Sequence, residues 1–488
     1  GQDLAMSRRR ALILLAAAAL FWLCRRAYFV GYFNDDAYYL IGAKSLLSGR
    51  YAEVSAPGAP PLVNYLPGWP FLLAPVLALT GASLPASQAF AVLLLVAGLL
   101  LFACVFERES GAEAADLALA CAAVSPLLSS TAATLLSDGP MLFCAGAALA
   151  VLPRLWRRRE ERVWLGFGLA LGLAALVRPT GLALAAAVAA VLLAEKRVAS
   201  ALGVFAVAAL VLGTWLGRNA LLSGAGWNYW REASAATRAG GIPFFANAWA
   251  CVDALFARSL LRPPTPSALW EAAAVLTGLG LALAGGRGLK TPSGRAAALF
   301  AALFALPHLV WPKTAARYFI PLLPIAAWLC LRGAARLGPR MMRAAAALSI
   351  ALSATATAGV VRASWSPSTS RNLPPRQTAD WLVARARPGE VVAAEYDARW
   401  HILTGLPCVH IPYDARTSQA LDRFLADSRV SFVVVEDTAD GLKPAAGAYS
   451  VPDASSLRGL LGAVKRARLV HSDGAGRVEV WFVRPLIW

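Results

Sequence analysis

Residues 86–106 read ASQAFAVLLLVAGLLLFACVF, a run of 21 positions without Asp, Glu, Lys or Arg. A helix of about 20 apolar residues is long enough to cross the hydrocarbon core of a bilayer. Similar segments, several of them shorter, occur on both sides of this run, and we therefore expect a polytopic α-helical membrane protein. The sequence predicts eleven membrane helices, at residues 11–30, 86–106, 115–131, 139–153, 163–177, 180–194, 198–217, 268–285, 296–312, 318–331 and 344–361.

The composition of the whole chain supports the same class of protein. Of 488 residues, 58% are hydrophobic and 15% are charged, and the mean hydropathy is +0.57. A soluble globular chain has about 45–50% apolar and about 25% charged residues, so these values argue against a cytosolic enzyme. The formal net charge of +18 would suggest a nucleic-acid partner in a soluble protein. Here most of the excess falls on short loops between apolar segments, and no nucleic-acid partner is expected.

The positions of Lys and Arg predict which loops face the cytoplasm. With the N-terminus inside, the inner segments include Arg8–Arg10, Arg154–Arg162 and Arg332–Arg343. This agrees with the excess of basic residues that cytoplasmic loops carry. Two longer segments, about 31–85 and about 218–267, then lie on the outer face, and the odd number of helices places the C-terminal part there as well.

The sequence pattern changes after residue 361. Residues 362–488 contain 16 Lys and Arg and 13 Asp and Glu, so this part is nearly neutral. We predict two domains, a membrane domain at 1–361 and a soluble domain at 362–488. Strands that alternate with helices indicate a small α/β layer, with mixed strand pairing at its end. The predicted elements are helices at 378–387, 418–427 and 455–466, strands at 390–394 and 430–435, and a strand pair around 474–483.

Cysteine and histidine give no strong signal of a disulfide framework or a metal site. Of seven cysteines, all but Cys251 and Cys408 lie in or beside predicted spans, where Cys behaves as a small hydrophobic residue. A bridge between these two stays open. The four histidines have no metal-ligand spacing. The sequence has no Walker loop, dinucleotide-binding glycine pattern or nucleophile elbow, so a nucleotide cofactor is not expected.

The first outer loop carries the residues that point most clearly to chemistry. It begins YFNDDAYYL at 32–40 and later reads NYLPGWPFLLAP at 64–75. Asp35 and Asp36 stand where the first helix leaves the bilayer, before a short helix closed by Gly49. Adjacent acids raise the pKa of one carboxyl of the pair, which suits a general base working near neutral pH. The alternative is that Asp35 caps the following helix and Asp36 is solvated.

Three further motifs follow this loop in order, LVRPTG at 176–181, TWLGRN at 214–219 and ARYFIPLLP at 316–324. Together with the loop, they resemble the GT-C membrane glycosyltransferases. The resemblance is closest to the family 39 type, which includes protein O-mannosyltransferases and the lipid A aminoarabinose transferase. It spans nearly the whole membrane part, and the C-terminal pattern resembles the soluble domain that many bacterial members carry.

The resemblance implies an inverting transfer of a sugar from a polyprenyl-phosphate donor to a lipid, polysaccharide or protein acceptor. The reaction would take place at the periplasmic face of the bacterial cytoplasmic membrane, where the C-terminal domain would also lie. By position in the motif, Asp35 is the catalytic carboxylate that accepts the proton of the acceptor hydroxyl. Asp36 matches the second acid, which supports or orients the first. A sugar hydroxyl is a poor nucleophile without such a base.

The same reaction needs cations for the departing lipid phosphate. Arg178, Arg218, Lys313 and Arg317 all fall at predicted outer ends of spans. A guanidinium can bind phosphate through two parallel hydrogen bonds. The alternative for each is an interfacial side chain that extends to the lipid headgroups.

Other candidate donor-binding residues are Tyr65 and Tyr318, which lie inside the motifs, and Asp138 at the outer start of a span. Asp138 would bind substrate, a metal or one of the arginines, or else cap its helix. The sequence lacks the Glu-Lys-Pro arrangement of the aminoarabinose transferase at Tyr65-Leu66-Pro67, so that substrate is in doubt. A divalent metal stays open, with Asp36 and Asp138 as ligands only if one is used.

Two other classes of protein remain as alternatives. A transporter or flippase for lipid-linked sugars would show related halves and ionisable groups near the middle of the membrane, and neither is evident here. A lipid-binding scaffold without catalysis would tolerate loss of Asp35 and Asp36.

The second outer loop carries aromatic residues that would cover the donor lipid, stack on a sugar or lie at the interface: Trp227, Tyr229, Trp230, Phe244, Phe245 and Trp249.

Overall fold

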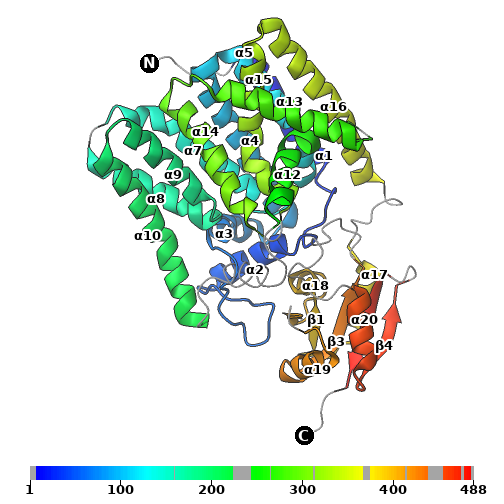
Figure 1. Ribbon diagram of the computed structural model, residues 1–488. Coiled ribbons are helices and arrows are strands. Elements are labelled where there is room, and N and C mark those ends of the chain that lie inside the picture. Colours follow the sequence, from blue (N-terminus) through cyan, green and yellow to red (C-terminus); the bar gives the residue numbers. More distant parts are fainter. Residues whose placement is uncertain are drawn as a thin grey trace.

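The apolar runs of the sequence form a bundle of helices, and the C-terminal part forms a small sheet with helices on its faces (Figure 1). This arrangement is seen in a computed structural model. The structure describes residues 7–158, 160–223, 243–263, 265–311, 314–366, 374–412, 415–437, 454–473 and 477–484. Lys313, Trp227, Tyr229 and Trp230 lie outside the described residues.

Every predicted membrane segment lies on one or two helices of the bundle. Among the described residues, six helices are long and apolar enough to cross a membrane. The number of crossings therefore stays a prediction. The helices on the predicted segments are α1 (Arg8–Leu23), α4 (Leu84–Ser110), α5 (Ala112–Ala123), α6 (Pro126–Thr131), α7 (Asp138–Trp156), α8 (Glu161–Val177), α9 (Gly181–Ala194), α10 (Val198–Ser223), α13 (Ala268–Gly286), α14 (Pro292–Leu309), η2 (Ala316–Leu322), α15 (Leu323–Ala335) and α16 (Pro339–Trp365).

Several predicted segments differ from the helices for local reasons. The segment at 115–131 is two helices, because Pro126 disfavours helical backbone at Ser125, whose side chain caps α6 instead. The first helix ends at Leu23 rather than residue 30, and turns follow through Arg25-Arg26. The segments at 163–177 and 180–194, by contrast, are two helices as the sequence predicts, since Arg178 between them is extended before Pro179.

The two long segments predicted to lie on the outer face contain helices of their own. The short helix predicted before Gly49 is α2 (Asp35–Leu47), and Gly49 follows it with a φ of +71°. The apolar helix α3 (Gly68–Thr80) begins within the second loop motif and was not predicted. The second loop contributes α12 (Phe244–Leu255) and the π-helical turn η1 (Phe256–Leu260).

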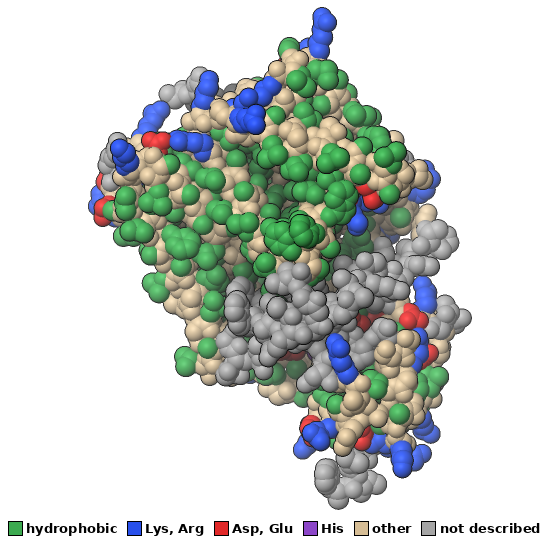
Figure 2. All heavy atoms as spheres, viewed as in Figure 1, with side chains coloured by type: hydrophobic (Ala, Val, Ile, Leu, Met, Phe, Trp, Pro, Cys, Tyr) green, Lys and Arg blue, Asp and Glu red, His purple; other side chains and the backbone are tan. Residues whose placement is uncertain are grey.

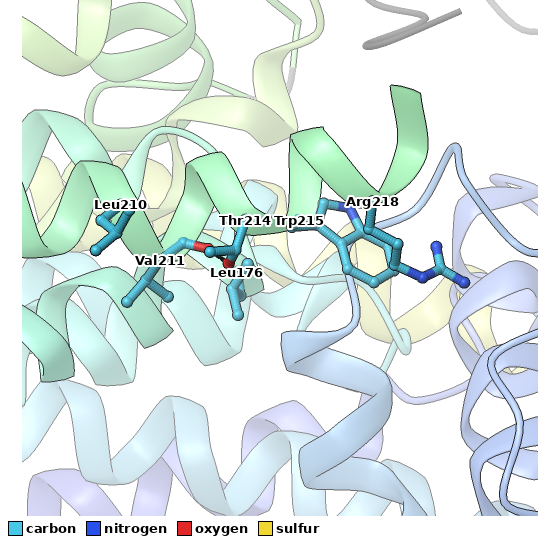
Figure 3. Close-up of a pocket in the computed structure, with 6 residues that line it drawn as sticks. All are labelled: Leu176, Leu210, Val211, Thr214, Trp215 and Arg218. Atoms are coloured by element: carbon cyan, nitrogen blue, oxygen red, sulfur yellow. Dashed lines mark hydrogen bonds between the residues drawn. The ribbon is translucent and has the colours of Figure 1, made fainter. Parts of the chain in front are cut away.

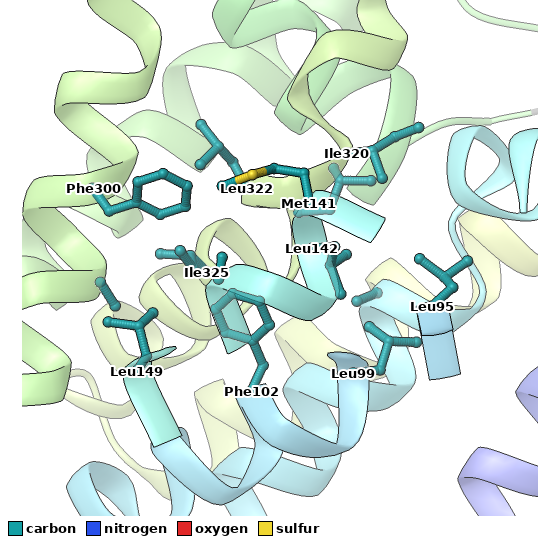
Figure 4. Close-up of a cluster of buried hydrophobic side chains, with 14 of the residues drawn as sticks. Leu95, Leu99, Phe102, Met141, Leu142, Leu149, Phe300, Ile320, Leu322 and Ile325 are labelled. Atoms are coloured by element: carbon teal, nitrogen blue, oxygen red, sulfur yellow. The ribbon is translucent and has the colours of Figure 1, made fainter. Parts of the chain in front are cut away.

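An apolar core packs η2 against the long helices. Figure 4 shows Phe102 of α4, Leu142 of α7, Phe300 of α14 and Ile320 of η2 pointing into one cluster, and each is at most 2% exposed. Small residues let other helices approach closely, as is common in membranes. A Cβ added at Gly333 of α15 would lie 2.0 Å from the carbonyl oxygen of a residue in α13. Helices α13 and α15 therefore pack closely against each other at this glycine.

The C-terminal domain has a five-stranded sheet in the order β2-β1-β3-β5-β4. Strand β1 pairs in parallel with β2 and β3, whereas β5 pairs antiparallel with β3 and β4, so the expected α/β layer with mixed pairing is confirmed. Helix α18 and strand β2 were not predicted. The elements are α17 (Arg376–Arg385), β1 (Val391–Ala394), α18 (Asp397–Thr404), β2 (Cys408–His410), α19 (Ser418–Asp427), β3 (Val430–Glu436), α20 (Ala454–Ala463), β4 (Ala467–Ser472) and β5 (Val478–Val483).

The surface of the bundle separates apolar from basic side chains. Figure 2 shows apolar side chains over the flank of the helices and Lys and Arg gathered at the end of the bundle away from the C-terminal domain. Cys251 and Cys408 are both free thiols, so the bridge left open by the sequence is not formed.

Candidate active site

Helix α2 begins at the two adjacent acids Asp35 and Asp36. Acidic residues in a first turn interact favourably with the helix dipole. Asp36 is fully buried, and its Oδ2 accepts a hydrogen bond of 2.8 Å from the backbone N–H of Gly31. Burial raises the pKa of Asp36 to about 6. The hydrogen bond of Asp36 thus connects the first turn of α2 to the preceding loop. The side chain of Asp35, in contrast, is 33% exposed.

Asp35 is held by two residues from distant parts of the chain. Its Oδ2 lies 2.6 Å from a terminal nitrogen of Arg317 in η2. The hydroxyl of Tyr65 donates to its Oδ1 at 3.3 Å. Three separate motifs of the sequence therefore meet at one carboxylate.

A second ion pair lies beside the first. Arg178, at the end of α8, places a terminal nitrogen 2.6 Å from Oδ1 of Asp138, the first residue of α7. The guanidinium carbons of Arg178 and Arg317 lie 5.0 Å and 5.1 Å from the ring centre of Tyr318. The tyrosine ring thus connects both pairs into one group, the Asp–Arg cluster, which consists of Asp35, Asp138, Arg178, Arg317 and Tyr318.

The Asp–Arg cluster has the chemistry to bind a phosphate next to a carboxylate. Its two guanidinium groups offer planar sets of N–H donors that fit phosphate oxygens. The Nε of Arg317 is buried and has no hydrogen-bond partner within the described part of the chain. A buried donor without a partner is costly, and a ligand oxygen would satisfy it.

Arg218 has a different setting from the other predicted cations. It donates to the carbonyl oxygens of Leu62 and Tyr51, each at 3.3 Å, and packs over the ring of Trp215. It also lines an apolar cavity of about 400 Å³ between α8 and α10. Figure 3 shows Leu210 at one end of this cavity and Arg218 at the other.

No group of three or more His, Cys, Asp or Glu side chains that could hold a metal is found in the described ranges. Of the two acids considered as ligands, Asp36 bonds to Gly31 and Asp138 pairs with Arg178.

The structure adds residues that the sequence did not single out as part of the site. The hydroxyl of Tyr39 donates to Ser137 at 3.1 Å, next to Asp138. His308 stacks on the ring of Tyr318, and Arg317 lies over the ring of Phe33. The sequence does show an aromatic pair after Asp36 and a histidine, His308, in an apolar helix. The spacing of these residues does not show whether their side chains face the Asp–Arg cluster.

Comparisons with known proteins show which fold the chain has. Residues 60–216 match the family model described as dolichyl-phosphate-mannose-protein mannosyltransferase. ArnT from Cupriavidus metallidurans, solved bound to undecaprenyl phosphate, superposes with a TM-score of 0.62 at 14% identity over 96% of this chain and 97% of that chain. The chain has the GT-C fold. This confirms the resemblance seen in the motifs.

A second GT-C structure is similar over a smaller share of its length. The archaeal oligosaccharyltransferase AglB from Archaeoglobus fulgidus, solved with an inhibitory peptide and a dolichol-phosphate, gives a TM-score of 0.54 at 15% identity. The match covers 87% of this chain and 69% of AglB. Among curated proteins, none matches this chain by sequence. These TM-scores show a shared GT-C fold, and at 14–15% identity the likeness extends to the fold alone.

The family model covers only part of the candidate site. Tyr65, Asp138 and Arg178 fall inside the matched residues 60–216, whereas Asp35 and Arg317 fall outside them. The roles of Asp35 and Arg317 therefore depend on the geometry of the Asp–Arg cluster.

Proposed function

We propose that the chain is an inverting glycosyltransferase that moves a sugar from a polyprenyl-phosphate carrier to an acceptor hydroxyl. The observation that carries this proposal is the contact of Asp35 with Arg317, beside Arg178, on a GT-C fold. The lipid carriers in the ArnT and AglB structures support the choice of donor.

In the proposed reaction, the oxygen of the acceptor hydroxyl attacks the anomeric carbon while Asp35 takes the proton of that hydroxyl. The bond from that carbon to the phosphate oxygen breaks on the opposite face of the sugar, so the configuration inverts. The two arginines of the Asp–Arg cluster offset the negative charge on the departing polyprenyl phosphate. Asp36 and Tyr65 hold α2 and the side chain of Asp35 in place.

We propose the outer face of a bacterial cytoplasmic membrane as the site of reaction. The catalytic domain would comprise residues 1–361, and residues 362–488 would form a domain on the same face that guides a lipid, polysaccharide or protein acceptor. The basic end of the bundle, away from that domain, supports this orientation (Figure 2).

The cavity that ends at Arg218 has the character expected for the lipid chain of the carrier. Its other lining side chains are mostly apolar, and it lies between α8, which ends at Arg178, and α10. A polyprenyl chain seated there would have its phosphate end near the outer ends of both helices. Arg218, at the end of this cavity, would then contact the carrier.

We expect Leu210→Trp to raise the KM for a polyprenyl-phosphate sugar about tenfold and leave kcat unchanged, because a filled cavity removes binding shared by ground and transition states. Leu210 is 66% exposed, so the larger side chain fits without disturbing the core. Steady-state kinetics in detergent would measure this. Leu202→Trp is the matched control, since Leu202 lies on the same helix, is 62% exposed and does not line the cavity. Equal KM values for the two variants would exclude the cavity as the carrier site.

Release of polyprenyl phosphate tests the proposed function as a whole. Purified protein would be incubated with a panel of polyprenyl-phosphate sugars and with membrane extracts as acceptor source, and the lipids would be analysed by mass spectrometry. We expect free polyprenyl phosphate to accumulate only with an acceptor present. A flippase or a lipid-binding scaffold would leave every donor intact, and that result would refute the proposal.

A further inference from the structure

Helix α18 of the C-terminal domain lies against the turn that precedes α2 (Figure 1). Ala398 of α18 is fully buried in a cluster with Ala37 and Ile41 of α2. The backbone N–H of Cys408, at the start of β2, donates to the carbonyl of Ser55 at 2.7 Å. The C-terminal domain therefore packs directly against α2, the helix that carries Asp35.

Asn34, the residue before Asp35, forms hydrogen bonds with α18 through both the nitrogen and the oxygen of its side-chain amide. Its Nδ2 donates to Asp397 at 3.2 Å, and its Oδ1 accepts from the backbone N–H of Arg399 at 3.2 Å. The backbone of Asn34 has φ of 61° and ψ of −44°. Residues other than glycine rarely adopt positive φ, and such conformations persist where the surroundings enforce them. The contacts from α18 supply that constraint one residue before the proposed base.

The side chain of Arg399 is directed almost entirely at the same turn. It is buried, and it donates to the carbonyl oxygens of Gly31, at 2.7 Å, and Tyr32. Its remaining terminal nitrogen pairs with Glu436 of β3 at 2.7 Å. Gly31 has φ of +99°, and a Cβ there would lie 3.3 Å from Arg399 atoms. The sheet of the C-terminal domain is thus connected through one arginine to the backbone that bonds Asp36.

A second set of contacts reaches Asp35 by another path. The hydroxyl of Tyr38 donates to Asp397 at 2.5 Å. The ring of Tyr38 stacks on Tyr65 with 4.3 Å between ring centres, and Tyr65 donates to Asp35. Asp397 is fully buried. One acid of the C-terminal domain therefore supports both the turn before Asp35 and the tyrosine that bonds it.

We propose that the C-terminal domain sets the position of the catalytic carboxylate, with Asp397 and Arg399 as positioning residues that act through Asn34, Gly31 and Tyr38. The inference rests on the proposed function, in which Asp35 is the base. It assigns the domain a part in the chemical step in addition to any contact with an acceptor. A small misplacement of a reacting group is costly in rate, so loss of these contacts lowers kcat more than it weakens donor binding.

The test compares Arg399→Ala with wild type for kcat, for KM with a polyprenyl-phosphate sugar, and for binding of undecaprenyl phosphate. We expect kcat to fall about 10- to 100-fold, while KM and lipid binding change less than about twofold. Arg399→Lys should recover part of kcat, since the ammonium keeps the charge but not the planar set of donors. The control is Arg466→Ala, which removes the ion pair with Asp422 inside the same domain and should leave kcat unchanged.

Asn34→Ala provides a second variant in case Arg399→Ala does not fold, because it leaves the interior of the C-terminal domain intact. The same fall in kcat is expected for it. Suppose that Arg399→Ala and Asn34→Ala both fold, bind the lipid and keep wild-type kcat, while Asp35→Asn is inactive. The positioning role is then wrong, and the proposed function stands. If Asp35→Asn itself keeps wild-type kcat, the proposed base is wrong and the inference falls with it.

Discussion

Asp35→Asn is expected to lower the kcat of sugar transfer by about 10²- to 10⁴-fold, the usual contribution of a general base. The amide has nearly the same shape as the carboxylate but cannot accept the proton of the acceptor. The substitution removes the charge partner of Arg317, whose side chain is 11% exposed, whereas the side chain of Asp35 itself is 33% exposed. Binding of undecaprenyl phosphate should persist, because the arginines of the Asp–Arg cluster remain. Single-turnover transfer and lipid binding on the same preparation would measure both.

The neighbouring acid is the matched control for this variant. Asp36 accepts a backbone hydrogen bond through one oxygen, and an amide oxygen at the same place can accept it as well. Asp36→Asn is therefore expected to lower kcat about tenfold or less. If Asp36→Asn abolished transfer while Asp35→Asn did not, the roles of the two acids would have to be exchanged.

Arg317→Ala is expected to reduce kcat/KM by about 10²- to 10³-fold, the scale seen when one donor to a developing negative charge is removed. Arg317 contacts Asp35, and its Nε is available to a phosphate oxygen. Arg317→Lys should restore part of the loss, because it keeps the charge without the paired donors. Steady-state kinetics with a polyprenyl-phosphate sugar would measure these effects.

Arg178→Ala serves as the contrasting variant. Its partner Asp138 has a side chain that is only 2% exposed, so removal of Arg178 leaves a buried carboxylate unpaired. Breaking a buried pair from one side costs about 3–5 kcal/mol, and we expect Arg178→Ala to lower thermal stability as well as activity. Arg317→Ala should lower activity with little loss of stability. A thermal shift of equal size for both variants would argue that Arg317 is mainly structural.

The sequence predicts the helices well because apolar runs are a local signal. Helix boundaries depend on single residues that interrupt such runs, as at Pro126 and Pro179. The class of protein and the C-terminal α/β layer follow from the same kind of pattern, and both are confirmed. Helix α3, which begins inside the motif around Tyr65, was missed because the motif was considered as loop.

The contacts within the candidate site are harder to predict from the sequence than the helices are, because they join residues that lie far apart in the chain. The motifs marked Asp35 and Arg317 as candidates, but only the fold shows that residues 282 positions apart form an ion pair. Arg218 was grouped with the other cations, whereas it lies at the end of an apolar cavity. Helix α18 was missed because Asp397 and Arg399 are buried polar residues, whose partners stand in the turn before α2.

The most direct test follows the sugar itself in reconstituted vesicles. A polyprenyl-phosphate donor labelled in the sugar would be placed in the bilayer with wild-type protein or Asp35→Asn, and the label would be partitioned between lipid and acceptor fractions. We predict that wild type moves the label from lipid to acceptor and leaves unlabelled polyprenyl phosphate, and that Asp35→Asn does neither. Label that stays on the lipid with both proteins, or leaves it equally with both, would contradict the proposal that Asp35 catalyses transfer from a lipid-linked sugar.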